Sequence, residues 1–111
     1  MARILIVEDD GAFRRFYKQI LIEAGHRAIP IHSLSSAKAE YDQDGPFDLV
    51  LCDGSVDRKG DGAQWALELS HKGQKVGVIS REPGLAQEGI PFLPKPFGLG
   101  RFLDFVGSLL P

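Results

Sequence analysis

The chain has 111 residues, 43% of them hydrophobic and 25% charged, with a formal net charge of −2. This length suits one domain with one core, and the charge shows no basic excess that would indicate a nucleic-acid partner. The single cysteine excludes an internal disulfide and no apolar run approaches membrane-spanning length, so we expect one cytoplasmic domain over residues 1–111 without membrane contact.

The first half of the chain alternates short aliphatic runs with helical periodicity, which is the pattern of a βαβ series. The first strand is expected at residues 3–8, followed by a helix that Asp10 caps. One apolar stripe runs along this helix: Phe13, Phe16, Tyr17, Ile20, Leu21 and Ala24. The second strand, residues 27–32, contains Pro30, which has no N–H for a ladder bond and therefore favours a sheet edge. A weaker helix is expected over residues 34–41.

The second half continues the same alternation. A third strand at residues 49–53 lacks polar alternation, as expected for a central strand covered on both faces. The remaining elements are expected to be a helix at residues 63–71, strands at 75–80 and 90–93, and a last helix at 99–110. The apolar residues that this last helix is expected to bury are Leu99, Phe102, Leu103, Val106 and Leu110.

The connection between the fourth and fifth strands is short. Residues 81–89 are fewer than the roughly ten to twelve residues that a parallel crossover with its helix usually needs. Pro83 and Gly84 also interrupt the place where a helix could start. The sequence therefore predicts a turn or two of helix here at most, or an irregular loop.

Alternating strands and helices predict an open, doubly wound parallel sheet, whose ligands bind beyond the carboxyl ends of the strands. Polar side chains follow these strand ends: Glu8 and Asp9 the first, Asp53 the third, Ser80 the fourth and Lys95 the fifth. Carboxylates crowded in this way repel one another unless a cation joins them or some take up protons. An oxygen-only set of this kind suits Mg²⁺.

Four short motifs at these strand ends together resemble the receiver domains of two-component response regulators, such as the chemotaxis regulators. They are "VED", "DLVLCD", the serine Ser80 and "PKPF", in this order. The resemblance covers essentially the whole chain. It implies a flavodoxin-like α/β fold with a five-stranded parallel sheet of order 2-1-3-4-5. The short connection over residues 81–89 departs from the family, because it leaves the helix between the fourth and fifth strands shortened or absent.

The resemblance further implies that Asp53 accepts a phosphoryl group from a histidine kinase or phosphotransfer protein and passes the signal to a downstream protein. It implies that Asp9 and Asp53, with the main-chain carbonyl of Ser55, hold Mg²⁺ or Mn²⁺, and that Glu8 supports the ion through water. Such a chain is a phosphoacceptor that assists its own phosphorylation and dephosphorylation, and it is not an enzyme with a separate substrate.

Three further residues have roles in this interpretation. Lys95 neutralises the charge that builds up when the aspartate oxygen attacks phosphorus, and Ser80 can donate one hydrogen bond to a phosphoryl oxygen. The resemblance implies a cis peptide bond between Lys95 and Pro96. Phe92 is either the switch aromatic of the family or a core residue.

Two other functions remain open. The first is an interaction module on a receiver fold that no longer takes phosphate, although the presence of Asp9, Asp53 and Lys95 argues against it. The second is a phosphatase of the haloacid dehalogenase kind. Those enzymes place a second acid two residues after the nucleophile, where this chain has Ser55, and the chain has no room for a cap domain.

Overall fold

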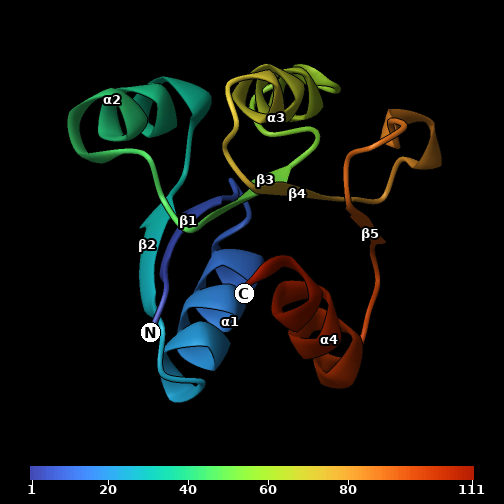
Figure 1. Ribbon diagram of the computed structural model, residues 1–111. Coiled ribbons are helices and arrows are strands. Elements are labelled where there is room, and N and C mark those ends of the chain that lie inside the picture. The colour runs from blue at the N-terminus through green and yellow to red at the C-terminus, as the bar shows by residue number, and fades with distance from the viewer.

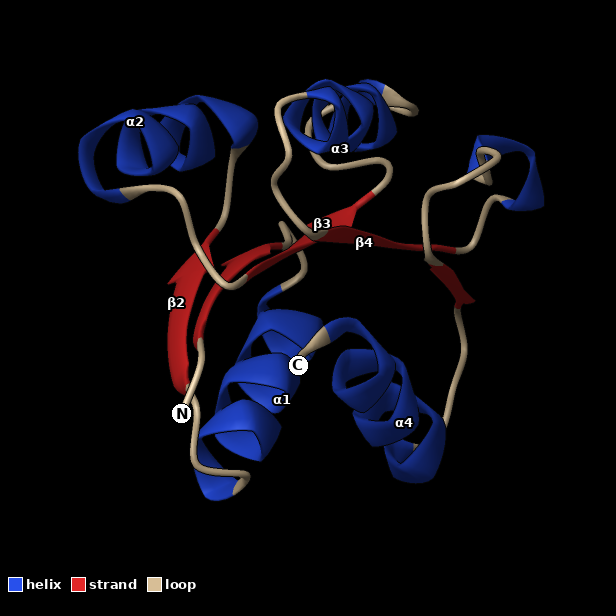
Figure 2. Ribbon diagram, in the orientation of Figure 1, coloured by secondary structure: helices blue, strands red, loops and turns tan.

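The computed structural model describes residues 1–111 and contains one five-stranded parallel sheet in the order β2-β1-β3-β4-β5. The strands are β1 (Arg3–Val7), β2 (Arg27–Ile31), β3 (Leu49–Asp53), β4 (Val76–Ser80) and β5 (Phe92–Pro94). The helices are α1 (Gly11–Glu23), α2 (Leu34–Asp44), α3 (Asp61–His71) and α4 (Leu99–Leu109). Helices α1 and α4 cover one face of the sheet, and α2 and α3 cover the other (Figures 1 and 2). The predicted fold class and strand order are confirmed.

Each face of the sheet has its own apolar core, because alternate strand residues point to opposite sides. The strand residues toward α2 and α3 are Leu5, Val7, Val50, Cys52, Val76 and Val78. Those toward α1 and α4 are Ile4, Ile6, Leu49, Leu51, Ile79 and Leu93. None of the helices combines the length and apolar character that a membrane crossing requires.

Most predicted elements agree with the structure to within one or two residues. Asp10 caps α1 as predicted, with its side chain accepting from the backbone N–H groups of Ala12 and Phe13. Pro30 lies in β2 at the edge of the sheet, where its missing N–H disrupts no central ladder. Helix α2 continues three residues beyond its predicted end, to Asp44.

The last helix buries only part of the apolar face predicted for it. Leu99 and Leu103 are 48% and 39% exposed, whereas Phe102 and Val106 are buried. The reason lies in β4, where a Cβ at Gly77 would come within 2.9 Å of the Phe105 ring. The space that this glycine leaves is filled by Phe105, which rotates Leu99 and Leu103 outward. The prediction that these two leucines are buried was therefore wrong.

The connection between β4 and β5 is one turn of 3₁₀ helix, Pro83–Leu85, in place of a full helix, as predicted. A hydrogen bond joins this connection to α3: the Gln87 side chain donates to the Ala63 carbonyl at 3.1 Å. Strand β5 begins at Phe92, two residues later than predicted. Ile90 instead donates its N–H to the Gln87 carbonyl at 3.1 Å within the connection.

Candidate functional site

The carboxyl ends of the central strands open into one pocket of about 290 Å³. Its lining residues are Glu8, Asp9, Asp10, Phe13, Asp53, Ser55, Ser80, Arg81, Glu82 and Lys95. All six residues that the sequence analysis assigned to phosphoryl or metal binding lie in this set. The topology explains the grouping, since parallel strands bring their carboxyl ends to the same edge of the sheet.

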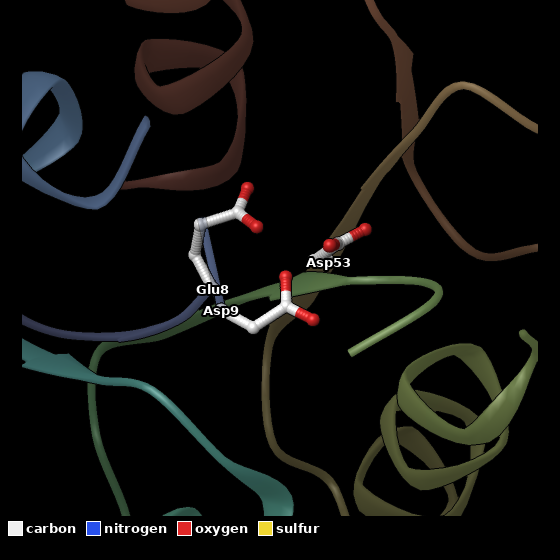
Figure 3. Close-up of side chains that lie close together, drawn as sticks. All are labelled: Glu8, Asp9 and Asp53. Atoms are coloured by element: carbon white, nitrogen blue, oxygen red, sulfur yellow. The ribbon is translucent and has the colours of Figure 1, made fainter. Parts of the chain in front are cut away.

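Three carboxylates in this pocket form a compact oxygen cluster. Glu8, Asp9 and Asp53 each offer an oxygen that lies within 4.8 Å of the other two (Figure 3). Glu8 is completely buried, Asp53 is partly buried and Asp9 is exposed. A hard divalent cation takes oxygen ligands of this kind while keeping waters on its open side. The donor set therefore fits Mg²⁺, with Asp9 and Asp53 on the accessible side of the cluster.

The Lys95 ammonium is the cation that faces this cluster. Its Nζ lies 2.7 Å from Glu8 Oε1, 4.0 Å from Asp53 Oδ2 and 4.1 Å from the centroid of the Phe13 ring. The main chain helps to fix its position, because the Lys95 N–H donates to the Ser80 carbonyl at 2.9 Å. The following peptide bond to Pro96 is cis, as predicted. In this structure Lys95 pairs more closely with Glu8 than with Asp53.

The carboxyl group of Glu8 has an unusually high pKa. Burial, helped by the nearby charge of Asp53, raises the pKa of Glu8 from 4.5 to about 7, although the ion pair with Lys95 acts in the opposite direction. Desolvation of the carboxylate therefore outweighs the attraction of a single ammonium. In the metal-free protein the carboxyl group of Glu8 therefore passes from its neutral to its charged form near neutral pH.

The raised pKa of Glu8 predicts a pH-dependent stability of the metal-free protein. The folded protein binds more protons than the unfolded chain between pH 4.5 and about 7, so the free energy of unfolding falls as pH rises through this window and levels off above it. A shift of this size corresponds to on the order of 3 kcal/mol. Urea unfolding with a chelator at about pH 5 and about pH 8 should show this loss in the parent but not in Glu8→Gln. Equal losses in both proteins would assign the pH dependence to other groups.

Ser55 and Ser80 each form a hydrogen bond that links the main chain to a side chain of the site. Ser55 donates its N–H to Asp53 Oδ1 at 3.2 Å, which fixes the orientation of that carboxylate. Ser80 is buried, and its Oγ accepts the Glu82 N–H at 3.0 Å, so its own proton remains available to another acceptor. Phe92 is half-buried in β5 and packs against the core under α2 and α3.

Three residues of α1 complete the site and were not assigned to it from sequence. Arg14 Nη1 donates to the carbonyls of Glu8 and Asp9, at 2.9 and 3.3 Å, and so holds the acidic turn. Phe13 lies beside the Lys95 ammonium, and Tyr17 buries its hydroxyl close to Glu8. The apolar stripe identified Phe13 and Tyr17 as core residues, and no sequence signal distinguishes Arg14 from a surface arginine.

No family model and no curated protein matches the chain. Several solved structures are similar to the chain over nearly its whole length. The non-phosphorylated receiver domain of HemR from Leptospira biflexa is 30% identical, with a TM-score of 0.82 over 98% of this chain and 94% of that one. The response regulator TrrA from Thermotoga maritima, solved in complex with Mg²⁺ and BeF, is 23% identical, with a TM-score of 0.84 over 99% and 100%.

A third solved structure agrees with these two. It is a CheY-like receiver domain from Methylobacillus flagellatus, 23% identical, with a TM-score of 0.81 over 98% of both chains. All three similarities span nearly the whole of this chain. The chain belongs to the receiver domains of response regulators.

Proposed function

We propose that this receiver is an active phosphoacceptor of two-component signalling. A histidine kinase or phosphotransfer protein transfers a phosphoryl group to Asp53, and the change at Asp53 alters the surface offered to a downstream protein. The observation that carries the proposal is the convergence of Asp53, Asp9 and Lys95 in one accessible pocket. The chain acts on itself in this reaction and has no separate substrate to turn over.

The transfer forms one bond and breaks another. An oxygen of Asp53 bonds to phosphorus as the P–N bond to the donor histidine breaks, and the donor nitrogen leaves with the bonding electrons. Both the carboxylate and the phosphoryl group are anionic, so the approach needs positive charge. Lys95 supplies part of it, since its Nζ lies only 4.0 Å from Asp53 Oδ2.

A divalent cation supplies the remaining positive charge when it is bound. Asp9, Asp53 and the main-chain carbonyl of Ser55 would hold it, and Glu8 would support it through water. Arg14 keeps the acidic turn in place through the Glu8 and Asp9 carbonyls. Ser80 donates its free hydroxyl proton to a phosphoryl oxygen.

The proposal is tested by incubating the chain with acetyl phosphate or phosphoramidate, with Mg²⁺ or with a chelator, and measuring the intact mass. We expect one added phosphoryl group with Mg²⁺ and none with the chelator, because the reaction brings two anions together. No addition to the folded protein under either condition would favour the interaction module. Addition that does not depend on the metal would place the chemistry outside the carboxylate cluster.

A further inference from the structure

Arg81 is a cation of the pocket that has no partner in the resting structure. It is the first residue after β4, and it is one of the residues that line the pocket. Arg81 is exposed, and its side chain makes no hydrogen bond or ion pair. Lys95, the other cation of the lining, is paired with Glu8 at 2.7 Å. Arg81 is therefore the positive charge of the pocket that is free to meet a new anion.

The main chain places Arg81 between the phosphoacceptor loop and Lys95. The two residues before it bond to both neighbouring strand ends: the Gly54 N–H donates to the Ile79 carbonyl at 3.1 Å, and the Lys95 N–H donates to the Ser80 carbonyl at 2.9 Å. Gly54 directly follows the acceptor in the chain. The backbone of Arg81 thus starts from an anchored position beside the acceptor, whereas its unpartnered side chain keeps its rotamer freedom.

The charges of the resting pocket can be balanced without Arg81. Asp10 accepts two backbone N–H groups at the N-terminus of α1, and Glu82 forms an ion pair with Lys59 at 3.5 Å. The three carboxylates of the cluster face the Lys95 ammonium, and a bound divalent cation would supply the remaining positive charge. The resting site therefore has no anion left over for the guanidinium.

Phosphorylation of Asp53 changes this balance. A phosphoryl group carries about −1.5 to −2 charge near neutral pH, so the modified side chain has up to about one more negative charge than the carboxylate had. Ser80 offers this group a neutral donor, and Arg81 is the lining residue that offers a further positive charge. A guanidinium suits phosphoryl oxygens well, because it can donate two parallel hydrogen bonds to them.

We propose that the Arg81 guanidinium binds the phosphoryl group on Asp53 and balances its added charge at the mouth of the pocket. The side chain is free in the resting protein and turns toward Asp53 only when the phosphoryl group is there. Arg81 thereby stabilises the phosphorylated state selectively and takes no part in holding the divalent cation. The inference rests on the proposed function of Asp53.

The test uses three variants of the full chain. Arg81→Ala removes the guanidinium, and Arg81→Lys keeps the positive charge without the two-pronged donor. Arg58→Ala is the matched control, because Arg58 is also exposed and unpaired and lies on the loop between β3 and α3, but it does not line the pocket. The melting temperature of each protein is measured alone, with Mg²⁺, and with Mg²⁺ at increasing concentrations of beryllium fluoride, the probe for the phosphorylated state.

The variants should differ only when beryllium fluoride is present. Arg81→Ala should need about tenfold more beryllium fluoride than the parent for the same rise in melting temperature, as expected for the loss of a hydrogen bond to a charged group. Its rise with Mg²⁺ alone should be no smaller than that of the parent, because removing a nearby positive charge does not repel a cation. Arg81→Lys should lie between Arg81→Ala and the parent, and Arg58→Ala should respond like the parent.

The outcomes separate the two proposals. A parent that shows no shift with Mg²⁺ and beryllium fluoride contradicts the proposed function, whatever Arg81 does. A parent that responds, together with an Arg81→Ala variant of unchanged affinity, overturns the role of Arg81 alone. An equal loss in Arg58→Ala also overturns it, since the effect would then come from net charge. A weaker response of Arg81→Ala to Mg²⁺ alone would assign Arg81 to the metal site and overturn its selectivity for the phosphorylated state.

Discussion

Asp53→Asn is expected to abolish phosphoryl addition from a small phosphodonor in the presence of Mg²⁺. The amide of asparagine has nearly the shape of the carboxylate and can still accept the Ser55 N–H at Oδ1, so the loop keeps its conformation. It lacks the charge and the nucleophilicity that attack on phosphorus requires. Intact-mass measurement should therefore find one added group in the parent and none in the variant.

Asp57→Asn is the matched control. Asp57 lies on the same loop and undergoes the same change of acid to amide, but it is not among the residues that line the pocket. Its Oδ2 accepts the Leu34 N–H at 3.2 Å, and its φ of 67° is a conformation that asparagine tolerates. This variant should take up the phosphoryl group as the parent does. Addition that persists in Asp53→Asn would move the acceptor elsewhere.

Asp53→Asn also has an expected effect that does not depend on phosphorylation. The charge of Asp53 helps to raise the pKa of Glu8, so its removal should lower that pKa toward the ordinary value. The loss of stability between about pH 5 and about pH 8 should then be smaller in the variant than in the parent. A smaller loss in the variant would show that Asp53 and Glu8 interact in the folded protein before any phosphodonor is added.

The fold could be predicted because its strongest signals are local. The uninterrupted apolar run of β3 indicated a central strand, Pro30 indicated an edge, and the few residues between β4 and β5 left no length for a helix. The outward rotation of Leu99 and Leu103 could not be predicted in the same way. It depends on Gly77 in β4, which makes room for Phe105, and a periodic pattern within the last helix contains no information about that distant glycine.

The membership of the site could also be predicted, since the ends of parallel strands share one edge of the sheet. The arrangement of the residues within the site could not be predicted. The sequence does not show that Glu8 is buried while its neighbour Asp9 is exposed, or that Lys95 pairs with Glu8 at 2.7 Å and lies 4.0 Å from Asp53. Phe13 lies beside the Lys95 ammonium and Tyr17 lies close to Glu8, yet their spacing in the sequence indicates a core helix and nothing about charge.

Lys95→Met is expected to lower the free energy of unfolding at about pH 8 by on the order of 1–3 kcal/mol, less than the cost of leaving a buried carboxylate ionised and alone, because Glu8 can take up a proton instead. Methionine retains most of the length and apolar character of the lysine stem, so packing against Phe13 is largely preserved. What is lost is the ammonium beside Glu8, which is completely buried. Urea unfolding of the metal-free variant at about pH 8 measures the effect.

The same variant should be much closer to the parent at about pH 5, because Glu8 is then protonated and has no charge to leave unpaired. The removal of Lys95 raises the pKa of Glu8 further, since the ion pair was the main influence that lowered it. Adding Glu8→Gln to Lys95→Met should restore most of the stability at about pH 8, as it removes the buried acid that must either stay ionised or take up a proton. A loss that is equal at both pH values and persists in the double variant would mean that Lys95 stabilises the fold through packing.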